Sequence, residues 1–143
     1  MSTNDTITTH LREATTTGRV VHLTTAQALT LGTGRLVCPI TDLYAALNQI
    51  TGDNLYTHQL PRAGRWVEPY IHAALSWTDQ EHRAQEYLDN HHPEEAMSLW
   101  AEDVSAAHGE THQVPYLGAY WKPQDPITEL HNLMNHPTPG DNE

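Results

Sequence analysis

Glycine and proline interrupt this chain at short intervals, and these interruptions limit most strongly what it can fold into. The 143 residues include 8 Gly and 9 Pro, which end or kink helices. Between these breaks, apolar residues recur every three to four positions, the period of an amphipathic helix. The pattern predicts a mainly α fold, a small single-domain bundle of about five to six short helices with room for one short β element.

Start and stop signals set the expected boundaries of these helices. Thr41 is the expected N-cap of the clearest helix in the N-terminal half, and Gly52 its stop. Pro69 is expected to break the following apolar stripe near Glu68. The predicted helices include residues 26–31, 80–88 and 126–134, and the run 20–23 has the character of a strand. A further helix is expected after a cap at Thr57, with an apolar stripe from Leu60 to Ile71. Another is expected to begin at Pro93, to have Ala107 on its apolar face and to stop at Gly109.

Length and composition indicate one small folded domain with loose ends. Domains commonly have about 100 to 200 residues, so 143 residues make one. Leu, Ile and Val number 26 and Phe is absent, so four Trp and six Tyr must supply much of the core. The Thr-rich residues 1–18 are expected to be a flexible lead, residues 19–136 a single helical domain and residues 137–143 a disordered tail.

All of the net charge lies in the second half of the chain. Residues 1–78 contain five acidic residues and five Arg, whereas residues 79–143 contain thirteen acidic residues against one Arg and one Lys, for a total of −11. An acidic surface repels phosphate backbones and attracts basic ones, so a basic protein surface is a better partner than nucleic acid. The acids expected to contact such a partner are Glu94, Glu95, Glu102 and Asp103. The alternative is a solvated face that only maintains solubility.

The densest polar motif lies between Thr51 and Arg62. Gly52 should end one helix and Thr57 should cap the next, so the polar residues between them form a corner. Backbone amides at the start of the second helix, with Arg62 and Arg65 one turn further on, suit a phosphate or carboxylate. The expected ligand-binding residues are Arg35, Thr51, Asp53, Asn54, Thr57, His58, Gln59 and Arg62. The alternative is that these side chains only cap helices and bind turn carbonyls.

Three segments carry a resemblance to a known family. They are Thr33-Gly34-Arg35-Leu36, residues 43–63 with the motif LYxxLNxxTGDNLYTHQLPRA, and Asp125-Pro126-Ile127-x-Glu129-Leu130. Together they resemble a family of small uncharacterised proteins from phages, prophages and other mobile elements, and the strong similarity covers residues 33–70. The family is a domain of unknown function. The resemblance therefore implies a mobile-element context and singles out residues 51–62 without assigning chemistry to them.

Catalytic and metal-binding hypotheses have weaker support. Asp53 and His58 would be the pair that activates water, so a hydrolase is the enzymatic alternative. His108 and His112 lack the Glu next to the first His that zinc proteases require, so no metal site or cofactor is expected. The single cysteine, Cys38, is expected to be a small buried hydrophobe.

These patterns together predict a non-catalytic binding protein of a mobile element. The expected partner is a host protein with a basic surface, whose activity (in host defence, for example) the chain would modulate or inhibit. A small phosphate-bearing ligand is the alternative partner. The sequence contains neither a membrane-spanning run nor a signal peptide, so a cytoplasmic location is expected. A homo-oligomer would let a chain poor in aliphatic residues bury more surface.

Overall fold

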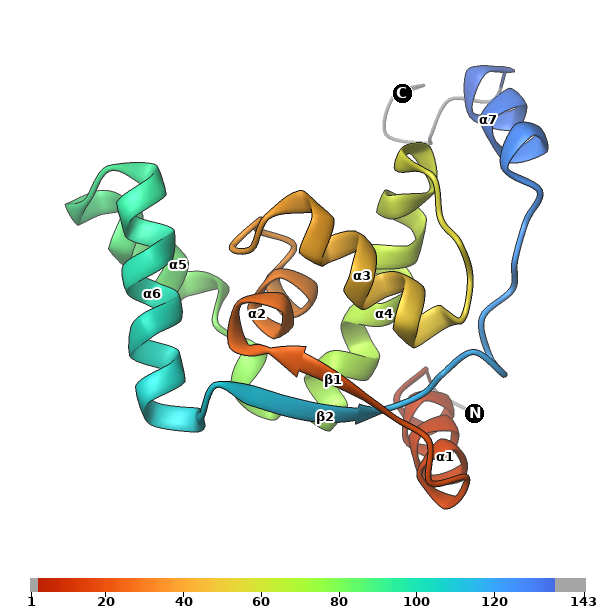
Figure 1. The fold of residues 1–143 in the computed structure, drawn as a ribbon, viewed down its shortest axis with the longest axis horizontal. Coiled ribbons are helices and arrows are strands. Elements are labelled where there is room, and N and C mark those ends of the chain that lie inside the picture. The colour runs from red at the N-terminus through yellow and green to blue at the C-terminus, as the bar shows by residue number, and fades with distance from the viewer. Residues whose placement is uncertain (1–2, 136–143) are drawn as a thin grey trace.

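The computed structural model describes residues 3–135, and these residues fold into a mainly helical domain with one small sheet (Figure 1). The elements are α1 (Thr3–Thr16), β1 (Val20–Thr24), α2 (Thr25–Thr33), α3 (Ile40–Thr51), α4 (Leu60–Ala74), α5 (Glu81–Asn90), α6 (Pro93–His108), β2 (Thr111–Pro115) and α7 (Pro126–Asn135). Single 3-10 turns at Thr57–Gln59 and Ser76–Thr78 precede α4 and α5. The predicted fold class is confirmed. The predicted tail, residues 137–143, lies outside the described residues.

Helices α2, α3 and α4 form the centre of the molecule, with the sheet beside them (Figure 1). The predicted apolar stripe of α4 is buried, with Ala63 and Val67 fully inaccessible and Ile71 nearly so. Gly34 and Gly52 end α2 and α3 in left-handed conformations, with φ of 77° and 71°, and the predicted stop at Gly52 is confirmed. These two stops turn the chain so that three helices share one core.

Helices α5 and α6 form a hairpin at one end of the molecule (Figure 1). Trp100 of α6 is fully buried and packs with Ala84 of α5 and Leu29 of α2. The stop at Gly109 is confirmed, whereas Ala107, predicted on the apolar face of α6, is exposed. The hairpin therefore contacts the body through a small apolar cluster and presents its other faces to solvent.

The two strands pair antiparallel, with Val21 opposite Val114. The strand character of residues 20–23 is thereby confirmed, and its partner is a segment about which the sequence predicts only a loop or a short extended piece. Both valines are buried against the core. The sheet thus joins two segments that are far apart in the sequence.

Residues 3–16 form helix α1, where the sequence predicts only a flexible lead. Ile7 and Ala14 are buried in the main core, and His10 Nδ1 lies 2.7 Å from the Tyr70 hydroxyl. Threonine lowers helix propensity only slightly, and its hydroxyl can bind a carbonyl one turn back, as Thr15 does with Leu11 at 2.7 Å. Tertiary packing outweighs that weak propensity, so the segment forms a helix although its composition is unfavourable for one.

Helix α4 continues through Pro69, so the predicted break near Glu68 is wrong. Proline removes one intrahelical hydrogen bond, the one to the carbonyl of Arg65. Arg65 is exposed, so water can solvate that carbonyl, while Val67 and Ile71 hold both sides of the proline against the core. Two predicted caps differ as well, because Pro39 occupies the N-cap position of α3 and the Thr57 side chain caps no helix.

Candidate functional site

The predicted polar corner at residues 51–62 does form, and its side chains hold the segment 121–129. Asp53 binds at both carboxylate oxygens: Oδ1 accepts from the Asn54 amide at 2.7 Å and Oδ2 accepts from Trp121 Nε1 at 2.9 Å. Trp121 is 4% exposed. Asp53 therefore satisfies the polar end of a buried ring that comes from far along the chain.

Arg62 and Gln59 both bind Glu129 at the start of α7. Arg62 donates from Nε to Oε2 and from Nη2 to Oε1, each at 3.0 Å. Gln59, itself 1% exposed, donates to Glu129 Oε1 at 3.1 Å. The third nitrogen of Arg62 donates to the Lys122 carbonyl at 3.2 Å, and its guanidinium lies 4.2 Å above the centre of the Trp121 ring. The whole head group of Arg62 is thus used inside the protein.

Glu129 is 5% exposed and acidic groups are rarely buried to this extent without a partner. Burial alone would raise the pKa of this carboxyl, but the hydrogen bonds from Arg62 and Gln59 and the positive charge of Arg62 lower it below its usual range. The carboxylate is therefore held ionised. The pair fixes the first turn of α7 to the first turn of α4.

The other predicted residues of the corner also bind within the chain. His58 Nε2 lies 2.8 Å from the carbonyl of Pro126. Thr51 donates to the Leu47 carbonyl at 2.7 Å, and the Thr57 hydroxyl binds the hydroxyl of Tyr44. Asn54 is exposed.

Arg35, the eighth predicted ligand-binding residue, does not join the corner. Its Nε donates to Glu81 Oε1 at 2.8 Å, and its Nη2 lies 2.7 Å from the same oxygen. This partly exposed pair connects the end of α2 to the start of α5.

The contacts of the corner residues together give it the geometry of an internal docking site for the C-terminal segment, with Arg62 and Gln59 bonded inside the protein.

The structure does not bring Asp53 and His58 together as a base and its orienting partner. In the described part of the chain, Asp53 binds Asn54 and Trp121, whereas the ring of His58 binds the Pro126 carbonyl. No group of three or more His, Cys, Asp or Glu side chains within residues 3–135 could hold a metal ion. His108 and His112 pack instead on the ring of Trp77.

Cys38 is buried, as predicted, and burial raises the pKa of its thiol. Thr30 Oγ1 lies 3.5 Å from the sulfur. A thiol with a raised pKa is a poor nucleophile at neutral pH. Cys38 therefore acts as part of the core.

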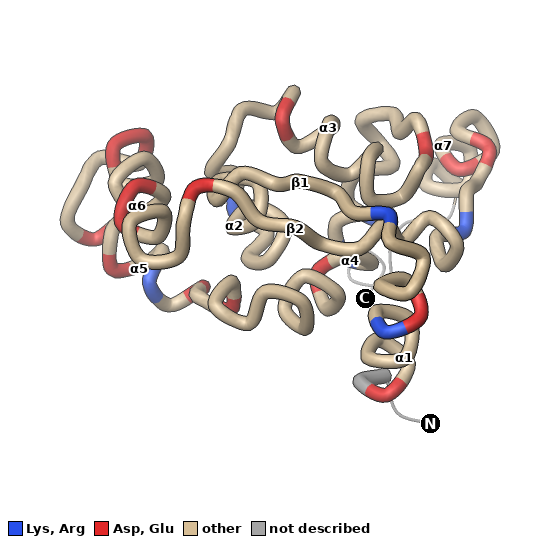
Figure 2. The backbone as a smooth tube through the Cα atoms, turned by 60° about the horizontal axis from the view of Figure 1, so that its bottom comes forward, with Lys and Arg blue, Asp and Glu red and all other residues tan. Residues whose placement is uncertain are grey.

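The acidic residues gather on the α5–α6 hairpin and its flanks (Figure 2). Residues 79–110 contain nine acidic residues against Arg83 alone. All nine are exposed: Asp79, Glu81, Glu86, Asp89, Glu94, Glu95, Glu102, Asp103 and Glu110. Of the four predicted partner-binding acids, Asp103 accepts a hydrogen bond from the Tyr87 hydroxyl, which raises the pKa of Tyr87.

A hollow of about 430 Å³ lies where α6 meets the start of α2. Its two charged residues are Glu102 and Glu110, and the remaining lining is small or polar: Thr24, Thr25, Ala26, Ala101, Ser105 and Ala106. No cationic side chain of the described residues lines it. Within the acidic surface, this hollow is large enough to admit a side chain of another molecule.

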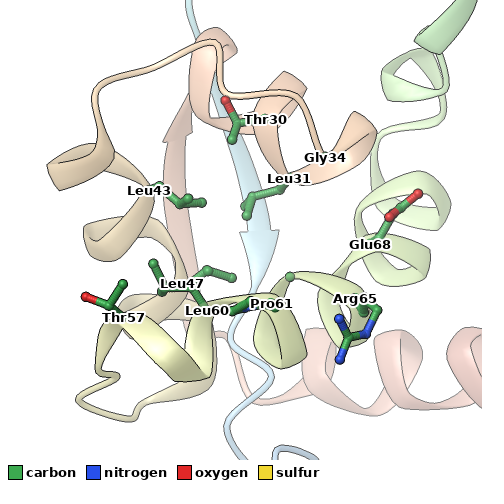
Figure 3. A pocket seen from close by; sticks show the side chains of 11 residues that line it. Thr30, Leu31, Gly34, Leu43, Leu47, Thr57, Leu60, Pro61, Arg65 and Glu68 are labelled. Atoms are coloured by element: carbon green, nitrogen blue, oxygen red, sulfur yellow. The ribbon is translucent and has the colours of Figure 1, made fainter. Parts of the chain in front are cut away.

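A second cavity, of about 450 Å³, lies between α2, α3 and α4 (Figure 3). Its walls are mostly apolar, and Arg65 and Glu68 are its two charged residues. The full lining is Thr30, Leu31, Gly34, Leu43, Leu47, Thr57, Leu60, Pro61, Gly64, Arg65 and Glu68. It adjoins the polar corner, because Thr57, Leu60 and Pro61 belong to both.

The comparison with known proteins covers the segment that builds both this cavity and the polar corner. Residues 23–81 match the model of a family described as a domain of unknown function (DUF7736). Neither the search of curated proteins nor the search of solved structures found a match. The matched segment contains every residue that lines the α2–α3–α4 cavity, but neither the α5–α6 hairpin beyond its first residue nor Glu129.

The sequence does not predict the α2–α3–α4 cavity, although Thr57 and Arg65 of its lining are among the residues expected near an anion. Its leucines belong to the apolar stripes of three helices and look like ordinary core positions. One feature of the sequence does hint at the cavity. Gly64 stands in the middle of a predicted helix, where glycine is destabilising, so its presence requires a local structural explanation.

Proposed function

We propose that this chain is a non-catalytic binding protein that docks on a basic protein surface through its acidic α5–α6 hairpin. The observation that carries the proposal is the concentration of nine exposed acids and one arginine in residues 79–110. Such a field speeds the encounter with a positively charged partner and selects against acidic ones. Glu95 and Glu102 are seven residues apart on α6 and so share one face of the helix.

The hollow beside Glu102 supports a specific mode of contact. A lysine or arginine side chain of the partner would enter it and lie between the carboxylates of Glu102 and Glu110, where neither meets a competing cation of the described chain. Guanidinium and ammonium groups form charge-assisted hydrogen bonds with carboxylates. The hollow thus gives the acidic surface a feature that a merely solvated face does not need.

The biological setting of the proposal is that of an accessory protein of a mobile element that acts on a host factor. The resemblance of residues 33–70 to small phage and prophage proteins supports this setting. None of the helices in residues 3–135 has the length and apolar character to cross a membrane. A phosphate-bearing ligand at the polar corner has less support, because Arg62 and Gln59 use their donors inside the protein.

The proposal is tested with a labelled peptide rich in Lys and Arg, using fluorescence anisotropy at low and high salt. Replacing Glu102 and Glu110 together by Gln should weaken binding about fivefold, since exposed ion pairs contribute about 0.5 kcal/mol each. Addition of Glu94→Gln and Glu95→Gln should weaken it further. All binding should fall as salt rises.

A matched control carries Glu13→Gln and Asp42→Asn, two exposed acids away from the hairpin. It has the same formal charge as the Glu102/Glu110 variant, so it should change the affinity less than twofold. Equal losses in both variants would show that only the total charge matters and would refute docking at the hairpin.

A further inference from the structure

The α2–α3–α4 cavity has the properties of a small-molecule site, and this inference does not depend on the proposed function. Known ligand pockets have volumes of about 300 to 1,000 Å³ and apolar walls with few polar groups. This cavity, at about 450 Å³, has five apolar residues in its walls: Leu31, Leu43, Leu47, Leu60 and Pro61. Three separate helices supply these walls (Figure 3).

Gly64 keeps this space open. It lies in the interior of α4, where glycine is less stable than alanine because it loses more backbone freedom on folding. A Cβ atom added at Gly64 would meet nothing within 4 Å. Packing inside the protein therefore gives no reason for a glycine here, whereas a ligand in the cavity would occupy the space that a side chain would fill.

Arg65 gives the cavity one available positive charge. Its side chain is exposed and, within residues 3–135, takes part in no hydrogen bond, ion pair or ring contact. Glu68, the other charged residue of the lining, approaches His72 at 4.0 Å. Figure 3 shows Arg65 and Glu68 leaving α4 in different directions. A negative group is therefore favoured beside Arg65 and repelled from the end marked by Glu68.

From these observations we propose that the α2–α3–α4 cavity binds a small molecule with an apolar body and a single carboxylate. The carboxylate binds the guanidinium of Arg65, which offers paired donors in the geometry of a carboxylate. The apolar body lies on the leucine walls, over the surface that Gly64 leaves uncovered. Glu68 sets the direction, so that the acidic end lies at Arg65.

Calorimetric titration of the full chain with octanoate, octanol and octylammonium tests the assignment. The three probes share one apolar chain and differ in charge. Octanoate should bind saturably and at least about tenfold more tightly than octylammonium, and octanol should lie between them. Arg65→Gln should weaken octanoate binding about tenfold, the effect of losing one charge-assisted hydrogen bond, and leave octanol binding unchanged.

Two further variants separate the cavity from general adhesion to the protein. Gly64→Leu fills the space and should abolish binding of octanoate and octanol, with a circular dichroism spectrum that shows an intact fold. Arg12→Gln, at an exposed arginine of α1 outside the cavity, should bind octanoate like the unaltered chain. Absence of saturable octanoate binding, or equal binding by Gly64→Leu, would overturn the site. Equal octanoate binding by Arg65→Gln would overturn the carboxylate.

Discussion

Two arginines one turn apart on α4 have opposite environments. Arg62 uses all three of its side-chain nitrogens on Glu129 and the Lys122 carbonyl and covers the ring of Trp121. Arg65, three residues later, makes no such contact within residues 3–135 and borders an apolar cavity. Most donors of the polar motif therefore serve internal docking, whereas Arg65, just beyond the motif, keeps its charge available at the edge of a cavity.

The sharpest test of this contrast is replacement of each arginine by alanine. Arg62→Ala leaves the buried carboxylate of Glu129 without its cation, and it should lower the free energy of unfolding by about 3 kcal/mol or release α7 locally. Arg65→Ala should change it by less than about 0.5 kcal/mol. Urea unfolding and amide hydrogen exchange of residues 126–135 measure both effects. Similar losses in the two variants would remove the contrast.

Lowering the pH should also weaken the contact between Arg62 and Glu129. The effect should be smaller than that of replacing Arg62. The pKa of Glu129 is lower in the folded chain than its ordinary value of about 4.3. The stabilisation by the ionised carboxylate is therefore complete above that ordinary value, and it is lost as the pH falls through the lowered pKa. Hydrogen exchange in α7 should increase in this range. Glu129→Gln should show no such step, and a step that persists in this variant would assign it to another group.

The hydrogen bond between Asp53 and Trp121 should contribute less to the free energy of unfolding than the pair of Arg62 and Glu129. Asp53→Ala leaves the buried indole N–H without an acceptor, at a cost of about 1.5 kcal/mol of unfolding free energy. Asp53→Asn keeps an acceptor oxygen and should lose less than half of that amount. Thermal unfolding of the two variants compares them, and an equal loss would show that the indole bond does not decide the effect.

A smaller stabilising effect, opposite in sign to those of Arg62→Ala and Asp53→Ala, is expected on the Arg65 side. Gly64→Ala should raise the free energy of unfolding by about 0.8 kcal/mol, because alanine favours a helix interior and the added methyl group meets no atom. Gly34→Ala is a matched control, since it lines the same cavity and is also unobstructed but has φ of 77°. It should destabilise the chain. If Gly64→Ala were also destabilising, the cavity would not be free space.

Much of the helical plan could be predicted from local signals. Gly52 and Gly109 mark the ends of their helices, and the apolar stripe of α4 is buried as its spacing indicates. The exceptions depend on distant contacts. Helix α1 forms because Ile7 and Ala14 reach the core, and Pro69 is tolerated because the helix is held on both sides of it.

The candidate site was less predictable for the same reason. The sequence places Asp53, Gln59 and Arg62 at one corner, and they do lie there. Their partners, however, are residues 121–129, more than sixty positions further along the chain. No local pattern shows which distant segment fills a polar corner, or that three apolar stripes leave a cavity between them.

The pairing of β1 with β2 has a consequence for how the molecule reaches its folded state. The strands enclose residues 25–110, which include the whole of α2 to α6. Bringing two ends of such a long segment together carries a large entropic cost, which only contacts formed earlier within the segment can reduce. The helices should therefore assemble first, and the sheet should close late on the folding pathway.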